Sequence, residues 1–330
     1  MLSKNIQNTK YTKSKYNIGK KRSQCIVVCP DNILLKNKSS NMIKNIKKIN
    51  INDDVKDEEI VIELTIAKGE IGPFINTNGE DSYYHIYFNN NKEETKRNYL
   101  TYDDDVSRIT VVIDYQVKSF KKLFYDCECI ESIYFRKFNR NNITSMRYMF
   151  YGCSNAKKID LSNFNTDNVT DMGFMFSDCS SLIELILSNF DTSKVTDMSY
   201  MFSDCSLLKK LNLYYFSTDN LKDMSGMFYK CSSLKKLIIS NFNTINVVNM
   251  YSTFSGCSSL ERLYISNFNT DNVNDMNSMF FGCSSLKELN LSNFNTDNVN
   301  NMLCMFYGCS LELIKKIKEK NHKIAEKAFV

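Results

Sequence analysis

Apolar and polar positions follow a pattern that repeats every 26 residues along most of the chain. In the unit that begins at Cys179, residues 182–190 (LIELILSNF) carry apolar residues two or three positions apart, so alternate side chains point to one side of a short extended segment. In residues 195–202 (VTDMSYMF), apolar residues three positions apart would share one face of a helix. The pattern predicts one short strand and one short helix in every unit.

Cysteine and phenylalanine mark the period most clearly. The marker cysteines, each 26 residues from the next, are Cys127, Cys153, Cys179, Cys205, Cys231, Cys257, Cys283 and Cys309. Two phenylalanine series, Phe124 to Phe306 and Phe138 to Phe294, keep the same spacing. Because a short strand cannot bury its apolar side alone, consecutive units must stack. We therefore predict an α/β fold, a right-handed leucine-rich-repeat solenoid with short parallel strands and one short helix per coil.

The flanking sequences predict caps for this array. Between residues 56 and 118, the runs EIVIELTIA, SYYHIYF and RITVVIDYQV alternate with polar stretches, which indicates a small β-rich N-terminal cap module. The solenoid itself is assigned to residues 119–311. Residues 312–330 place Leu313, Ile317 and Ile324 on one side, so we predict a C-terminal amphipathic capping helix. Caps are expected because an open end would expose the core of the stack.

Charge is concentrated at the N-terminus. Residues 1–50 contain twelve Lys or Arg and a single acid, Asp31, so this segment carries +11 although the whole chain carries +5. We expect residues 1–55 to form a basic, disordered tail. Residues 1–50 could contact nucleic acid or an acidic membrane surface, or could simply be solvated.

No apolar stretch is long enough for a signal peptide or a transmembrane segment. On this basis we expect a cytoplasmic location and reduced cysteines. We also expect a monomer.

Three units carry a family resemblance: CSSLIELILSNFDTSKVTDM (179–198), CSSLERLYISNFNTDNVNDM (257–276) and CSSLKELNLSNFNTDNVNNM (283–302). They resemble the BspA-like leucine-rich repeats, a family typified by bacterial and protist surface proteins. The resemblance covers residues 118–311, and its signature, MFxxCSSLxxLxLSNF, is specific for the repeat type and not for a ligand. It implies a place at the cell surface, contact with host proteins, matrix or other cells, and no catalytic residues.

The candidate binding surface is the outer face of the predicted sheet. The column seven residues after each marker cysteine varies while its neighbours repeat. This column, with Tyr214 added, gives the candidate residues Tyr134, Asp160, Ile186, Asn212, Tyr214, Ile238, Tyr264 and Asn290. Exposed aromatic and aliphatic side chains on a sheet suit contact with a protein partner. The alternative is that they are isolated surface residues without a role.

A mixed column with basic character in its middle runs beside these residues, five positions after each marker cysteine. It consists of Ser132, Lys158, Glu184, Lys210, Lys236, Arg262 and Glu288. An acidic or phosphorylated partner could bind Lys210 and Lys236 together with Lys209 and Lys235. We expect a solvated edge instead, because lysine commonly protects exposed strand edges.

The marker cysteines form a structural ladder in this interpretation. Stacked coils repeat at about 4.8 Å, which would permit disulfides, but a thiol between two apolar segments should be buried and act as a small apolar residue. A straight column offers too few converging ligands for zinc, and Cys25 and Cys29 lack a second pair. Cys129 and Cys304 fall outside the column and have no assigned role.

Two polar rows are also interpreted as structural. Asn163, Asn189, Asn241, Asn267 and Asn293 should bond the backbone of the turn that leaves each strand. The acidic row from Asp171 to Asp275 should cap helix starts, although a calcium ladder is the alternative.

No catalytic constellation is visible, because His85 and His322 are the only histidines and both lie outside the repeats. We therefore expect a non-enzymatic protein-binding or adhesion-type module without cofactor or metal. The alternative is an intracellular scaffold that its basic tail localises to nucleic acid or acidic membrane.

Overall fold

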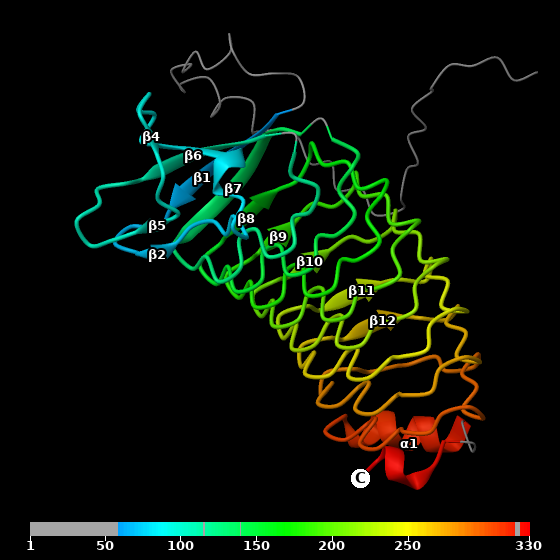
Figure 1. Ribbon diagram of the computed structural model, residues 1–330. Coiled ribbons are helices and arrows are strands. Elements are labelled where there is room, and N and C mark those ends of the chain that lie inside the picture. The colour runs from blue at the N-terminus through cyan, green and yellow to red at the C-terminus, as the bar shows by residue number, and fades with distance from the viewer. Residues whose placement is uncertain (1–58, 115, 139, 321–323) are drawn as a thin grey trace, which may run out of the picture. The chain divides into compact units, whose positions relative to one another are not determined.

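The computed structural model describes residues 59–114, 116–138, 140–320 and 324–330, so the expected basic tail lies outside the described residues. Within these ranges the chain is mostly strands and turns (Figure 1). The helical elements described are α1 (Leu311–Lys320) and two 3-10 helices, η2 (Asp81–Tyr83) and η3 (Glu326–Ala328). The strands are β1 (Ile60–Ile66), β2 (Gly72–Pro73), β3 (Tyr84–Phe88), β4 (Glu94–Thr95), β5 (Tyr99–Leu100), β6 (Arg108–Ile113), β7 (Ile130–Lys137), β8 (Lys158–Asp160), β9 (Glu184–Leu185), β10 (Lys210–Leu211), β11 (Lys236–Ile238) and β12 (Arg262–Tyr264).

The N-terminal strands and the first repeat share one sheet. Its strand order is β4-β3-β6-β1-β7-β8, and β1, β3 and β6 lie in the three segments predicted to be extended. β1 pairs antiparallel with β6 and with β7, whereas β7 pairs parallel with β8. The N-terminal strands therefore cover the first unit through main-chain hydrogen bonds, since β7 belongs to the array and to their sheet.

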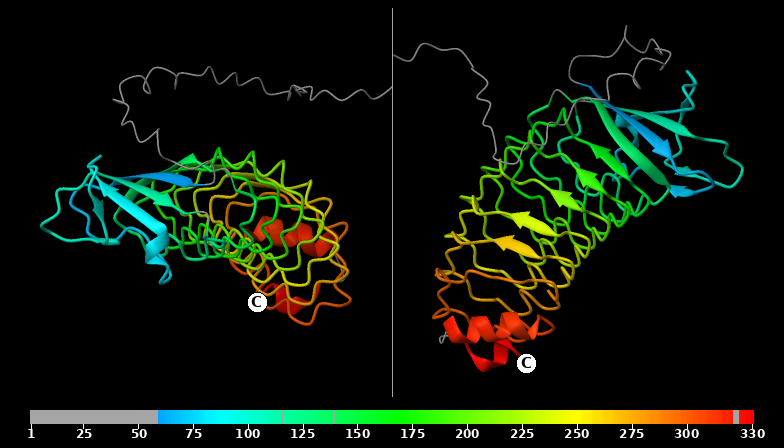
Figure 2. Two further views of the ribbon diagram at one scale, coloured as in Figure 1. Left: turned by 45° about the horizontal axis from the view of Figure 1, so that its top comes forward. Right: turned by 180° about the vertical axis from the view of Figure 1, so that it is seen from behind.

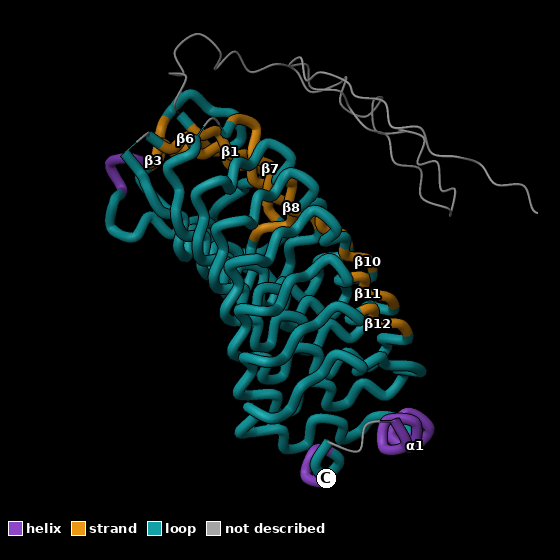
Figure 3. The backbone as a smooth tube through the Cα atoms, turned by 90° about the vertical axis from the view of Figure 1, so that its right-hand side faces the viewer, coloured by secondary structure: helices purple, strands orange, loops and turns teal. Residues whose placement is uncertain are grey.

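The remaining strands form a column in which residues 26 positions apart lie in register. Lys210 pairs with Glu184 and Lys236 with Arg262 in parallel ladders, and an isolated bridge continues from Arg262 to Glu288. Figure 2 shows the short strands side by side, and Figure 3 shows that they follow one side of the array. The predicted parallel strands are confirmed from β7 to β12, whereas the unit that begins at Cys283 contributes only the isolated bridge at Glu288.

A column of phenylalanine rings forms the centre of the core, inside the array. Phe124, Phe150, Phe176, Phe202, Phe228, Phe254, Phe280 and Phe306 are fully buried. Neighbouring rings in this column stack nearly parallel, with centroids 5.4 to 5.8 Å apart. Each ring buries a large apolar surface, so the column contributes to the stability of every unit.

The predicted helix in each unit is wrong. In residues 195–205 the backbone forms consecutive turns, and the N–H groups of Met198, Tyr200 and Phe202 donate to carbonyls of the next unit. Tyr200 and Asp204 have φ angles of 53° and 56°, in the left-handed region that an α-helix does not contain. A stacked neighbour supplies hydrogen-bond partners, so these segments satisfy their backbone without helix formation.

The C-terminal segment closes the other end in two parts. Leu313 and Ile317 of α1 are buried, but the helix is shorter than predicted, and Ile324 lies beyond it. The segment that follows α1 packs against the last unit. The carbonyl of Ala328 accepts the N–H of Phe306 over 2.7 Å, and the ring of Phe329 stacks on that of Phe306 with centroids 5.4 Å apart. Phe329 therefore covers the end of the phenylalanine column. In the part of the chain that the structure describes, no helix has the length and apolar character needed to cross a membrane.

Candidate functional site

The eight candidate residues all lie along the strand column, and we call this set the outer strand face. It consists of Tyr134, Asp160, Ile186, Asn212, Tyr214, Ile238, Tyr264 and Asn290. All are exposed except Asp160, which is half-buried. The five apolar and aromatic members have exposed fractions between 39% and 66%, which places them in solvent.

Strand alternation explains this exposure. In β11, Leu237 is fully buried while Lys236 and Ile238 on either side are exposed, and in β12 Leu263 lies buried between exposed Arg262 and Tyr264. Successive strand residues point to opposite faces, so one leucine per strand anchors the unit and its neighbours face outward.

Ile238 and Tyr264 are the two apolar members that the structure brings together. They are directly opposite each other in the β11–β12 register, and the ammonium group of Lys236 lies 5.7 Å from the ring centre of Tyr264. Ile186 lies two units away from Ile238. Tyr214 contacts the ring of Tyr215 edge-on, with centroids 5.3 Å apart.

The three polar members are committed to the backbone. In each case the side-chain oxygen accepts a hydrogen bond from the backbone N–H two residues later, at 3.0 to 3.1 Å. The acceptors are Asp160, Asn212 and Asn290, and the donors are Ser162, Tyr214 and Ser292. These are turn-forming bonds. Asp160, Asn212 and Asn290 therefore shape the turn after each strand, which sequence reasoning missed at these positions.

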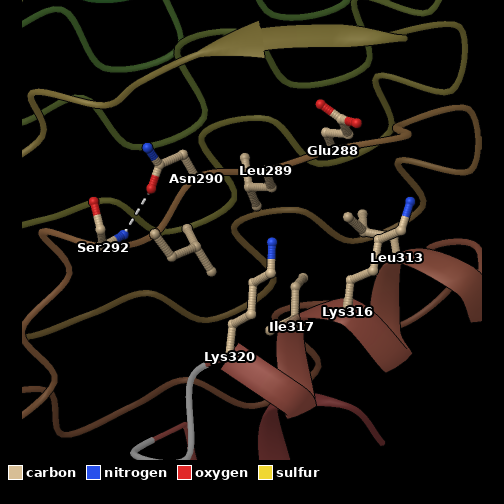
Figure 4. Close-up of a pocket in the computed structure, with 9 residues that line it drawn as sticks. Glu288, Leu289, Asn290, Ser292, Leu313, Lys316, Ile317 and Lys320 are labelled. Carbon is tan, nitrogen blue, oxygen red and sulfur yellow. Dashed lines mark hydrogen bonds between the residues drawn. The ribbon is translucent and has the colours of Figure 1, made fainter.

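A hollow of about 670 Å³ lies at the C-terminal end of the outer strand face. Figure 4 shows residues 288–292 on one side and α1 on the other, with the side chains of Ile317 and Lys320 directed from α1 toward the strand residues. Half-buried Leu289 and buried Leu313 provide its apolar part. The hollow exists because α1 takes the place of another strand, so the repeat pattern alone did not predict it.

The marker cysteines are all buried. From Cys153 to Cys309, each thiol donates a hydrogen bond to the carbonyl of a phenylalanine one unit earlier, at 3.0 to 3.2 Å. Burial raises the pKa of these thiols, to about 12 for Cys257 and about 11 for Cys309. They are therefore protonated donors inside the array and not nucleophiles.

Cys129, Cys304, Cys25 and Cys29 were left without an assigned role. Cys129 is buried, and its thiol donates to the carbonyl of Pro73 over 3.3 Å, which links the residue before β7 to β2. Cys304 is half-buried in the last turn segment. Cys25 and Cys29 lie outside the described residues.

The asparagine row bonds the backbone as predicted: the amides of Asn267 and Asn293 donate to Ser240 and Ser266 of the preceding unit, each over 2.7 Å. The acidic row differs from its predicted role at helix starts, because the turn segments are not helical. Instead Asp197 accepts the N–H of Ser199 over 2.8 Å, and the equivalent bond recurs along the row.

A surface aromatic stack on the turn segments was not predicted. The rings of Tyr148, Phe174 and Tyr200 stack with centroids 4.7 and 4.8 Å apart. Arg147 lies over two of these rings and pairs with Asp197 at 2.6 Å. The 26-residue spacing of the three aromatic residues was the signal that could have identified this stack.

Among the described residues, no group of three or more His, Cys, Asp or Glu side chains is arranged to hold a metal ion.

A family model described as "Mycoplasma protein of unknown function, DUF285" matches residues 118–240 and 222–328. The two overlapping matches coincide with the repeat array and its C-terminal closure. No curated protein and no solved structure matches the chain.

Proposed function

The chain belongs to the DUF285 family, described as Mycoplasma protein of unknown function, and we propose that it is a non-enzymatic protein-binding module of adhesion type. In this proposal the array is a right-handed leucine-rich-repeat solenoid of the BspA-like type, and the outer strand face is its contact surface. The observation that carries the proposal is the pair Ile238 and Tyr264, directly opposite each other and about half exposed.

Contact energetics support this choice of surface. Burial of an aliphatic side chain contributes about 1.5–3 kcal/mol, and tyrosine is frequent among the residues that dominate interface energies. Ile238 and Tyr264 also sit on short strands whose leucines are fixed in the core, so little conformational entropy is lost when a partner covers them. The outer strand face is therefore anchored by buried leucines and partly apolar, which suits a contact site.

The chain offers a matched control for the test. Ile245 and Tyr251 have exposed fractions of 47% and 39%, close to those of Ile238 and Tyr264, but lie outside the strand column. The test immobilises the full chain, the variant Ile238→Ala/Tyr264→Ala and the variant Ile245→Ala/Tyr251→Ala, and measures retention of proteins from the cells that produce it and from cells that it contacts.

We expect a defined protein that is retained by the wild type and the control but whose retention falls about tenfold on the Ile238→Ala/Tyr264→Ala variant. Equal retention on all three chains, or loss on the control variant alone, contradicts the proposal.

A second candidate function rests on the +11 charge of residues 1–50. In that case the chain is an intracellular scaffold that this segment localises to nucleic acid or to an acidic membrane. Deletion of residues 1–50 then abolishes localisation, and binding through them weakens steeply with salt. Unchanged localisation after the deletion excludes this alternative.

A further inference from the structure

Positive charge gathers on the middle units of the outer strand face. Five cations lie on three consecutive units, and we call them the basic patch: Lys209, Lys210, Lys235, Lys236 and Arg262. All five side chains are exposed, and in the described part of the chain none of them forms an ion pair. The patch is therefore a cluster of like charges and not a salt-bridge network.

The structure removes the simplest explanation for these lysines. Lysine protects the edge of a sheet from unwanted pairing, but β10, β11 and β12 each lie between neighbouring units of the column. Moreover, Lys236 is directly opposite Arg262, and like charges in this position destabilise a sheet. β10 and β11 belong to separate two-stranded sheets, but they contact each other, so neither edge is open to another chain. The pairing of Lys236 with Arg262 therefore has a stability cost that edge protection does not explain.

Acidic residues limit the patch instead of neutralising it. Glu184 pairs in register with Lys210 at one end, and Glu288 bridges to Arg262 at the other. Glu261 directly precedes Arg262, and its carboxylate is bound by Lys287 at 3.1 Å, with Lys235 and Arg262 near enough to help lower its pKa. Lys236 has Arg262 directly opposite it and the ring of Tyr264 beside it, and its strand β11 also contacts β10, which carries Lys210.

The basic patch and the apolar pair share one face. Lys236 precedes Ile238 by two residues, and Arg262 precedes Tyr264 by two, so each strand presents a cation and an apolar side chain to the same side. A ligand lying across the strands would meet positive charge along one side and apolar surface along the other.

We propose that the protein partner contacts this face with an acidic segment that also carries apolar side chains. This inference rests on the proposed function of the outer strand face. Charge complementarity of this kind chiefly raises the association rate and the specificity. A nucleic acid fits less well, because the patch spans three units, ends at Glu184 and Glu288, and is bordered by Ile238 and Tyr264.

The test uses the full chain and a fluorescent peptide of alternating glutamate and leucine, with a glutamine–leucine peptide and a single-stranded oligonucleotide of equal charge for comparison. The patch variant is Lys236→Gln/Arg262→Gln. The matched control is Lys194→Gln/Lys222→Gln, which removes two exposed lysines outside the strand column. Every chain keeps residues 1–50, so attraction by that segment is the same in all of them.

We expect the wild type and the control to bind the glutamate peptide about tenfold more tightly than the glutamine peptide, a preference that salt weakens and the patch variant loses. Lys236→Arg should retain it, and a thermal melt should show that the variants are folded. The proposal is overturned if the patch variant still prefers the glutamate peptide to the glutamine peptide. It is also overturned if the wild type binds the oligonucleotide more tightly than the glutamate peptide and the patch variant no longer binds the oligonucleotide. If only the Ile238→Ala/Tyr264→Ala variant loses binding, and loses it for both peptides, the acidic partner is excluded. The proposed function of the outer strand face then still holds.

Discussion

The thiol of Cys205 donates a hydrogen bond to the backbone carbonyl of Phe176, one unit earlier in the chain, over 3.1 Å. The same carbonyl accepts the N–H of Cys179 over 3.2 Å, so two cysteines of neighbouring units meet at one oxygen. Because this arrangement repeats along the array, each thiol fills space and links two units. The cysteine column is therefore part of the stacking interaction itself.

Burial predicts a sharp difference in thiol reactivity. In the native chain, iodoacetamide should modify half-buried Cys304, whereas Cys205 and Cys231 should react only after denaturant unfolds the array, because their thiols are buried and protonated. Peptide mass spectrometry after timed labelling measures both rates. Native labelling of Cys205 as fast as that of Cys304 would show that the ladder is open to solvent.

The raised thiol pKa values predict alkaline destabilisation. An unfolded cysteine ionises near pH 8.5, whereas burial raises the pKa of Cys257 to about 12. Below the unfolded pKa the stability is fully present, and above it the unfolded state loses protons first, so stability falls as pH rises toward the folded pKa. In this pH range, each buried thiol should lower the free energy of unfolding by about 1.4 kcal/mol for every pH unit of increase.

Urea unfolding between pH 8 and pH 10.5 tests this dependence, with Cys257→Ala as the comparison. The variant should be less stable at neutral pH but should lose less stability on alkalinisation. Parallel losses in both chains would mean that tyrosine ionisation, and not the thiols, governs the alkaline limb.

Two adjacent phenylalanines separate core packing from surface exposure. Phe280 is fully buried and stacks at 5.5 Å on Phe254 and on Phe306, whereas Phe281 has an exposed fraction of 38%. Phe280→Ala should lower the free energy of unfolding by about 3–5 kcal/mol, and Phe281→Ala by about 1 kcal/mol or less. Similar losses in chemical denaturation would contradict the stacked column.

Two glycines with positive φ differ in what lies next to them. A side chain at Gly226 would meet the ring of Tyr200, since an added Cβ would lie 2.3 Å from it, whereas one at Gly282 would meet no atom closer than 3.9 Å. Both alanine variants suffer the left-handed backbone, which costs about 1 kcal/mol. Gly226→Ala should lose about 1 kcal/mol more, because Tyr200 must leave its stack on Phe174.

A Tyr200→Ala background provides the control for this comparison. In that background the two glycine variants should be equally destabilised in thermal or urea unfolding. If Gly226→Ala is still more destabilising than Gly282→Ala in this background, a clash with the Tyr200 ring is not the cause.

Periodicity alone was sufficient to predict the strand positions, because only one face of each strand is buried and Leu237 or Leu263 must point inward. It failed for residues 195–205, because apolar side chains three positions apart fit both a helix and consecutive turns. The choice depends on the backbone of the next unit, which offers carbonyls to Met198 and Tyr200. A single unit, considered alone, contains no such partner.

The candidate site was predictable to a similar extent. Alternation placed Ile186, Ile238 and Tyr264 in solvent, since their neighbours had to be buried. The turn bond of Asn212 depends on local backbone angles, and the hollow beside α1 depends on how a C-terminal segment packs against Leu289. Both are properties of the assembled chain that residue spacing does not encode.

Site-specific photo-crosslinking shows directly whether a protein partner lies against the outer strand face. A photoreactive phenylalanine derivative replaces Tyr264 in one chain and Tyr251, which is similarly exposed outside the strand column, in another. We expect one specific crosslinked protein from position 264 and none from position 251. Crosslinks from position 251 alone, or the same products from both positions, would contradict this expectation.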